Sequence, residues 1–143
     1  MTRVRLDLPE RLPYSTEIPV RISDINYGGH LGNDAVLSIV HEARVRFLRH
    51  HKFTELDVAG AAILMVDAVI AYRSEGFYGD VLRVEVGVQD VQSAGCDIVF
   101  RLTNAGTGKE VARAKTGIVF VDPEGKKIIP VPPVFLDRCL PGI

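Results

Sequence analysis

The sequence predicts an α+β fold in which an antiparallel β-sheet wraps around one long central α-helix, in the element order β-α-β-β-β-β. Only one long segment has apolar residues at spacings of three and four, the period of a helix with one buried face. One strand-like segment precedes it and four follow, and short links join the last four. A helix with a single apolar stripe and no second long helix beside it must bury that stripe against the sheet, which gives a two-layer domain.

The composition is typical of one soluble globular domain spanning residues 1–143. Hydrophobic residues make up 47% and charged residues 24% of the 143 positions, which excludes a disordered or fibrous chain. Seventeen basic against eighteen acidic side chains give a net charge of −1, so nothing favours nucleic acid or an anionic membrane surface as a partner. Small or apolar molecules fit this balance better.

No membrane span, disulfide or metal site is expected. The longest apolar run, from Val58 to Ile70, is broken by Asp67 and is shorter than the roughly 20 residues of a spanning helix. The first ten residues lack the apolar core of a secretory signal, so we expect a cytoplasmic protein. Cys96 and Cys139 have no CxxC spacing and are expected to be reduced thiols.

The first strand is predicted from Thr16 to Ser23, where Ile18, Val20 and Ile22 alternate with polar residues and face the core. A loop rich in turn-forming residues follows from Asp24 to Asn33 and contains three glycines.

The helix begins after this loop, and Asn33 or Asp34 is expected to cap it with a side-chain oxygen. It runs for about five turns. Its apolar stripe consists of Val36, Ile39, Val40, Ala43 and Phe47.

Four further strands are predicted, and short links imply that they pair antiparallel. They cover Ile63 to Tyr72, Val81 to Val91, Asp97 to Leu102, and Glu110 to Val121. The first of them is apolar on both faces apart from Asp67, so we expect it to be covered on two sides. Asn104 to Gly108 forms a hairpin turn, and prolines from Pro130 onward end regular pairing before a short tail.

Four short motifs occur in order along the chain. They are Asp24, Asn26, Gly29, His30, Leu31, Gly32 and Asn33 ahead of the helix, Glu42, Ala43 and Arg44 within it, Gly79-Asp80, and Val119-Phe120-Val121-Asp122. With these motifs the chain resembles the hotdog-fold thioesterases, and most closely the 4-hydroxybenzoyl-CoA thioesterase and acyl-CoA thioester hydrolase branch, over about residues 14–135. The resemblance implies hydrolysis of an acyl thioester without a metal or redox cofactor.

One residue departs from the pattern of this branch. Its members carry a second aspartate that attacks the thioester or activates water, and Asn26 stands at this position. An amide cannot accept a proton from water. Asn26 can therefore only orient water or substrate, and a proton acceptor must be sought among His30, Glu42, Asp24 and Asp67.

Each candidate has a functional and a structural interpretation. His30 can exchange a proton near neutral pH, or it holds the loop. Glu42 resembles the carboxylate that faces the ligand cleft in many hotdog thioesterases and is the favoured general base, but it can also pair with Arg46. Asp67 needs a partner or a wet cleft inside an apolar strand. Asp24 is a substrate-binding candidate that can instead anchor the loop through backbone amides.

Two further residues belong to the expected site. The resemblance places an oxyanion donor at the backbone amide of Asn33, where free amides and the helix dipole can stabilise negative charge. Tyr27 is expected to contact the acyl or aryl group.

Three functions remain open at this point. The first is a thioesterase acting on an acyl-CoA or related thioester, with its site between subunits of a homodimer or homotetramer. The second is a hydratase or dehydratase of the same fold, whose D-x-N-P-x-H motif is similar to Asp24-Ile25-Asn26 followed by His30. In this chain the spacing to the histidine is one residue longer, and no proline follows Asn26. The third is a non-catalytic acyl-CoA-binding protein, with Asn26 as the mark of lost catalysis.

Overall fold

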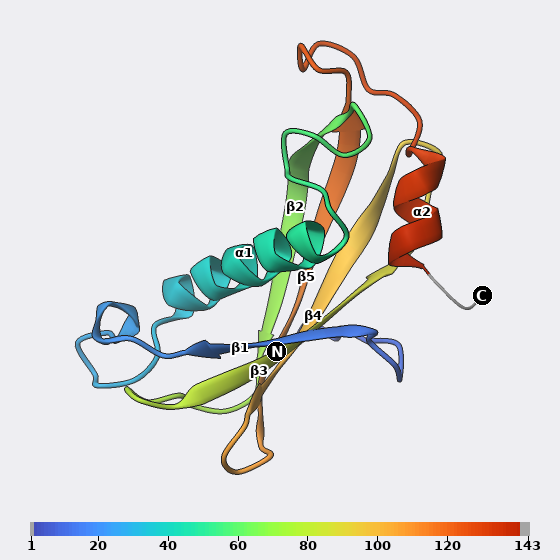
Figure 1. The fold of residues 1–143 in the computed structure, drawn as a ribbon. Helices are drawn as coiled ribbons and strands as arrows, with labels where there is room; N and C mark the ends of the chain where they lie inside the picture. The colour runs from blue at the N-terminus through green and yellow to red at the C-terminus, as the bar shows by residue number, and fades with distance from the viewer. Residues whose placement is uncertain (1, 141–143) are drawn as a thin grey trace.

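The computed structural model describes residues 2–140, which form one antiparallel sheet and two α-helices (Figure 1). The strands are β1 (Tyr14–Pro19), β2 (Ala62–Tyr72), β3 (Val81–Gln89), β4 (Gly95–Asn104) and β5 (Glu110–Val121). The helices are α1 (Asn33–His50) and α2 (Pro133–Cys139), and a 3-10 turn covers Ile22–Asp24. The α+β class and the antiparallel sheet are as predicted.

The strands lie in the order β1-β3-β4-β5-β2, and every neighbouring pair is antiparallel. The last four strands are antiparallel to their neighbours, as predicted, but β2 pairs with β5 and not with β3, the strand that follows it in the chain. The link between β2 and β3 is not a hairpin but a connection that crosses to the other half of the sheet. As predicted, the turn at Asn104 closes a hairpin, and the Asn104 Oδ1 accepts hydrogen bonds from the amides of Gly106 and Thr107.

Helix α1 lies across one face of the sheet (Figure 1). The predicted stripe of Val36, Ile39, Val40, Ala43 and Phe47 is buried, with 2% exposure or less at each residue. It packs on inward-facing residues of β3, β4 and β5 in one continuous core. Burial of this apolar surface supplies most of the energy that fixes the helix on the sheet.

The first strand and the helix start differ from their predictions. Strand β1 ends at Pro19, and Ile22 belongs to the following 3-10 turn with 70% exposure. Helix α1 is capped by the backbone of Gly32, without a side-chain hydrogen bond from Asn33 or Asp34. The Asn33 side chain instead accepts a hydrogen bond from the amide of Asp34. The strand ends where the Asp24 carboxylate accepts the amide of Arg21 and holds the 3-10 turn, and α1 lacks a side-chain cap because a glycine occupies the N-cap position.

Strand β2 is not covered on two sides in the single chain. It is an edge strand, and Leu64, Met65 and Val66 are between 40% and 58% exposed. A bulge between Met65 and Asp67 interrupts its pairing with β5. An apolar strand at a sheet edge is a surface on which further chain can pair.

The C-terminal segment holds a short helix that sequence patterns missed. Helix α2 follows the prolines, and its Phe135 is fully buried against Phe120 and Phe53. The prediction of two unpaired thiols is confirmed, because Cys96 and Cys139 are free and buried. Within residues 2–140, neither helix combines the length and apolar character needed to cross a bilayer.

Replacing Phe47 with alanine is expected to lower the free energy of unfolding by about 3–5 kcal/mol, because the fully buried ring leaves a cavity between α1 and the sheet. Urea denaturation followed by circular dichroism measures this change. Leu56→Ala, at an apolar side chain with 84% exposure, is the control and should cost less than about 1 kcal/mol. Equal losses in the two variants would contradict the packing role of Phe47.

Candidate active site at the start of helix α1

The loop between β1 and α1 is closed by Asn26. Its Oδ1 accepts hydrogen bonds from the amides of Gly28, at 2.9 Å, and His30, at 3.2 Å. Its own backbone N–H donates to the His30 carbonyl at 2.8 Å. Gly29 completes the turn with a φ of +83°, which side chains rarely tolerate. A carboxylate at position 26 could accept the same two amides, so Asn26 holds the loop without adding a negative charge.

The loop is held against the β2–β3 connection. The amide of Leu31 donates to the carbonyl of Gly76 at 2.8 Å, and a Cβ at Gly76 would lie 3.1 Å from the Leu31 side chain. Because this contact fixes the loop beside residues 74–77, the His30 ring lies against Phe77, with ring centroids 5.2 Å apart. The His30 Nε2 lies 3.3 Å from the Glu75 carboxylate.

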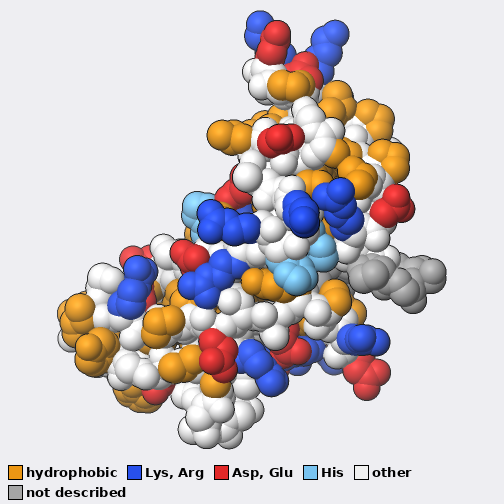
Figure 2. Space-filling view, in the orientation of Figure 1, with side chains coloured by type: hydrophobic (Ala, Val, Ile, Leu, Met, Phe, Trp, Pro, Cys, Tyr) orange, Lys and Arg blue, Asp and Glu red, His pale blue; other side chains and the backbone are white. Residues whose placement is uncertain are grey.

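These segments enclose a cleft of about 590 Å³ at the N-terminal end of α1. It is lined by Asn26, Tyr27, His30, Leu31, Asn33, Tyr72, Arg73, Ser74 and Glu75. Four of the residues predicted for the site, Asn26, Tyr27, His30 and Asn33, are therefore together. Figure 2 shows that hydrophobic side chains are exposed at this end of the molecule. The Tyr27 side chain is among the exposed large hydrophobic side chains and is fully accessible to solvent.

The start of α1 offers hydrogen-bond donors to this cleft. As the first helical residue, Asn33 has no acceptor for its N–H within the helix. Among residues 2–140 its N–H donates no hydrogen bond, and its side chain accepts the next amide, that of Asp34. Its carbonyl accepts a hydrogen bond from the Tyr72 hydroxyl at 2.9 Å. Burial and the charge of Asp34 raise the pKa of Tyr72 above its ordinary value.

Three predicted residues lie outside the cleft. Glu42 pairs with Arg46, whose Nε lies 2.8 Å from its carboxylate, and Arg46 is held in turn by Thr16. Asp24 is buried and accepts the amide of Arg21 at 2.8 Å, so it anchors the 3-10 turn. Asp67 pairs with Lys115 at 3.1 Å and accepts the amide of Gly117 at the β2 bulge. For Glu42 and Asp24 these contacts are those of the structural interpretation, whereas Asp67 has a partner and also lines a second hollow.

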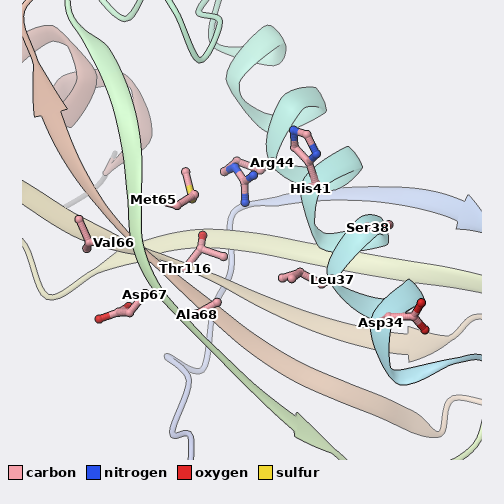
Figure 3. Close-up of a pocket in the computed structure, with 10 residues that line it drawn as sticks. All are labelled: Asp34, Leu37, Ser38, His41, Arg44, Met65, Val66, Asp67, Ala68 and Thr116. Carbon is pink, nitrogen blue, oxygen red and sulfur yellow. The ribbon is translucent and has the colours of Figure 1, made fainter. Parts of the chain in front are cut away.

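A second hollow lies between α1 and β2 (Figure 3). Arg44, whose side chain is only 7% exposed, lines it and lies 3.4 Å from the Glu55 carboxylate, which also binds the His41 ring at 2.9 Å. Burial lowers the pKa of Arg44 from its ordinary value, and Glu55 opposes this change. Sequence patterns pointed neither to this cluster nor to Glu75, since the partners are more than ten residues apart along the chain.

Within residues 2–140, no group of three or more His, Cys, Asp or Glu side chains has the arrangement of a metal site.

Comparison with known proteins shows the family and the fold of the chain. Residues 20–139 match the family model of the thioesterase-like superfamily. No curated protein matches the sequence.

Several solved structures share the fold. A 1,4-dihydroxy-2-naphthoyl-CoA thioesterase from Synechocystis is 22% identical with a TM-score of 0.80, covering 90% of this chain and 96% of its own. The probable thioesterase YbaW from Escherichia coli is 21% identical with a TM-score of 0.69, covering 88% and 95%. A DHNA-CoA thioesterase from Staphylococcus aureus is 19% identical with a TM-score of 0.70, covering 89% and 83%.

Replacing Asn26 with alanine is expected to loosen the loop, because the amides of Gly28 and His30 lose their acceptor. We expect a loss of about 1 kcal/mol in the free energy of unfolding and faster hydrogen exchange at these two amides, measured by NMR. Asn26→Asp keeps an oxygen at the same place and is the matched control, with exchange rates near those of the wild type. Faster exchange in both variants would show that the side-chain oxygen does not hold the loop.

Proposed function

This chain belongs to the thioesterase-like superfamily, and on that premise we propose that it hydrolyses an acyl thioester, with acyl-CoA as the expected form, to a free acid and a thiol. The observation that carries the proposal is the cleft that brings the unpaired Asn33 amide, His30 and Asn26 to the start of α1. A thioester whose carbonyl oxygen points at the Asn33 N–H would be polarised by that donor and by the helix dipole.

We assign the proton acceptor to His30 instead of Glu42. The His30 imidazole lines the cleft and is oriented by Glu75, whereas Glu42 is occupied by Arg46 outside it. With one ring nitrogen facing Glu75, the other is free to take a proton from water. The water oxygen bonds to the carbonyl carbon, the resulting oxyanion lies at the Asn33 amide, and the C–S bond breaks as His30 returns the proton to the sulfur.

The thiol end of the substrate has a basic place to bind beside this cleft. Arg73 lines the cleft and also an adjoining hollow of about 570 Å³, into which Arg3 and Arg5 extend. One guanidinium group can donate two parallel hydrogen bonds to the oxygens of a phosphate group. This arrangement supports coenzyme A as the carrier of the acyl group.

We further propose that a second copy of the chain covers the face formed by α1 and the β2 edge. Leu37 and Val45 on the helix and Leu64, Met65 and Val66 on the strand are all exposed there. An unpaired strand edge beside an apolar patch fits a symmetric homodimer, and a homotetramer would add a second interface. Asp67, and Glu42 through its position on α1, would then lie near the neighbouring subunit.

Replacing His30 with glutamine is expected to lower kcat by about 100-fold or more, because the general base is lost. Release of free thiol from a panel of acyl-CoAs measures this. Glu75→Gln keeps the His30 imidazole but removes the carboxylate that orients it. This variant should lose less activity and should show a shifted pH dependence of kcat. His50→Gln, at an exposed histidine at the far end of α1, is the control.

Two results would contradict this assignment. A loss in Glu42→Ala as large as that in His30→Gln would assign proton transfer to Glu42. If the wild type binds acyl-CoA but releases no thiol from any member of the panel, the chain is a binding protein and not an enzyme.

Sedimentation velocity is expected to show a dimer or tetramer for the wild-type chain. Leu64→Lys, which adds a charge at the apolar edge of β2, should shift the protein toward monomer. Leu56→Lys, at an exposed leucine in the loop before β2, should leave the assembly unchanged. A monomeric wild type would contradict the proposed interface.

A further inference from the structure

Residues 2–12, which we call the N-terminal strap, lie on the face of the sheet opposite α1. The residues of β4 and β5 that contact the strap alternate along their strands with core residues, and successive side chains of a strand point to opposite faces. Leu12, at the base of the strap, is 7% exposed. A Cβ at Gly87 of β3 would lie 2.8 Å from its side chain, so the glycine allows the strap to approach the sheet closely.

Side chains of the sheet hold the strap by its backbone. Gln89 and Arg101 donate hydrogen bonds to strap carbonyls at 3.5 and 3.4 Å, and the Arg113 Nη1 donates to the Leu6 carbonyl at 3.1 Å. Within the described part of the chain, no hydrogen bond joins the backbone of residues 2–12 to another backbone group. The position of the strap therefore depends on these side chains, and Arg113 makes the shortest of the three bonds.

Glu110 fixes the orientation of Arg113. The Nε and Nη2 atoms of Arg113 lie 2.7 and 3.3 Å from the two carboxylate oxygens of Glu110. Because the guanidinium group is planar and rigid, this pairing also sets the direction of Nη1, the atom that reaches the strap.

The strap leads from this contact to the edge of the sheet beside the active-site cleft. Arg101, Arg113 and Ala71 are paired in one row across β4, β5 and β2. Residues 2–5 lie beside Ala71 at the end of this row and enclose with β2 the hollow of about 570 Å³. Arg73 lines both this hollow and the cleft. The tip of the strap therefore borders the proposed site.

This hollow carries an excess of positive charge. Arg3, Arg5 and Arg73 line it, and no carboxylate belongs to its lining. Within residues 2–140 Arg3 forms no ion pair, and Arg5 uses one nitrogen for Asp7 at 3.5 Å. A guanidinium group has five N–H donors, so most of the donors of these two exposed side chains remain available to an anion.

A third hollow, of about 470 Å³, lies on another side of Arg73 and has a different charge balance. Its lining contains Lys109 but also the carboxylates of Glu75 and Asp80. A phosphate group there would be repelled by two negative charges. An anionic ligand is therefore favoured in the hollow formed by the strap.

We propose that the N-terminal strap is part of the substrate site, where Arg3 and Arg5 act with Arg73 on the phosphate groups of the thiol carrier. Arg113 is a positioning residue that holds the strap in place without touching the substrate. This inference rests on the proposed thioesterase function and adds that recognition of the carrier depends on the strap. The phosphate chemistry is shared by coenzyme A and by the phosphopantetheine arm of a carrier protein.

The first test compares thioesters that differ in their phosphate groups. Release of thiol is measured for octanoyl-CoA, octanoyl-4′-phosphopantetheine and octanoyl-pantetheine. The wild type should have a kcat/KM about tenfold or more higher for octanoyl-CoA than for octanoyl-pantetheine, because hydrogen bonds between guanidinium and phosphate are charge-assisted. An advantage kept by the phosphopantetheine ester identifies the phosphate that coenzyme A shares with carrier proteins. An advantage that requires the whole coenzyme identifies its nucleotide phosphates.

The double variant Arg3→Ala/Arg5→Ala should reduce this ratio to about threefold or less, through a higher KM for octanoyl-CoA. Both side chains are exposed, so the fold should be unaffected. The control Arg11→Ala/Arg49→Ala removes the same charge at two exposed arginines outside the hollow. It should keep the ratio of the wild type.

Arg113→Gln removes the donor to the Leu6 carbonyl and should also lower the ratio, by raising KM for octanoyl-CoA with little change in kcat. A merely structural role would instead affect octanoyl-CoA and octanoyl-pantetheine equally. Arg83→Gln is the matched control, because Arg83 lies on the same face and pairs with Glu85 at 3.9 Å without a hydrogen bond to the strap. It should keep the ratio of the wild type.

Calorimetry of coenzyme A and pantetheine tests the strap independently of hydrolysis, because neither ligand contains a thioester. The Kd of the wild type should be about tenfold or more lower for coenzyme A, and Arg3→Ala/Arg5→Ala should remove most of this difference. If thiol is released but neither kcat/KM nor Kd depends on phosphate, the proposed function stands and the role of the strap is refuted. If no thioester is hydrolysed, the proposed function fails, and the two Kd values alone decide the role of the strap.

Three further results would overturn the proposal. A ratio that survives in Arg3→Ala/Arg5→Ala would exclude the strap from the site. An equal loss in Arg11→Ala/Arg49→Ala would reduce the effect to net charge. A ratio unchanged in Arg113→Gln, or lost equally in Arg83→Gln, would refute the positioning role of Arg113.

Discussion

Burial of the apolar face of α1 against the sheet is the constraint on which the other features depend. Val40, Ala43 and Phe47 are fully buried in the core, so the helix cannot rotate or slide without opening cavities. This fixes the direction in which the first turn points. The free amide of Asn33 is thereby held beside Tyr72 of β2 and beside the loop closed by Asn26.

The same packing separates two environments along α1. At its start lies a polar cleft with His30 and Glu75, and farther along, between the helix and β2, lies an apolar hollow that ends at Arg44 and Thr116. The exposed edge of β2 borders both regions, so a second copy of the chain at that edge would close them from water and strengthen every polar contact inside.

Much of the candidate site could be predicted from one short motif and its resemblance to a known family. Asn26, Tyr27, His30 and Asn33 lie within eight positions, so the turn that joins them also brings them to one cleft. Glu75 could not be found in this way, because it reaches His30 only through the contact of Leu31 with Gly76. The helical step of 100° per residue places Glu42 at the edge of the apolar stripe of α1. Whether its carboxylate faces a ligand or Arg46 depends on β1, because Thr16 of that strand accepts a hydrogen bond from Arg46.

The periods of two and about 3.6 residues are local properties of the chain, and they were enough to find the sheet-forming segments, the long helix and its buried face. Which strands become neighbours is decided by contacts between distant segments, and so β2 lies at an edge with its apolar residues exposed. The burial of Arg44 and Thr116 has the same origin. From the sequence alone, a polar side chain on an amphipathic helix or strand is predicted to be exposed to solvent. Only the packing of distant segments around it decides whether it is buried.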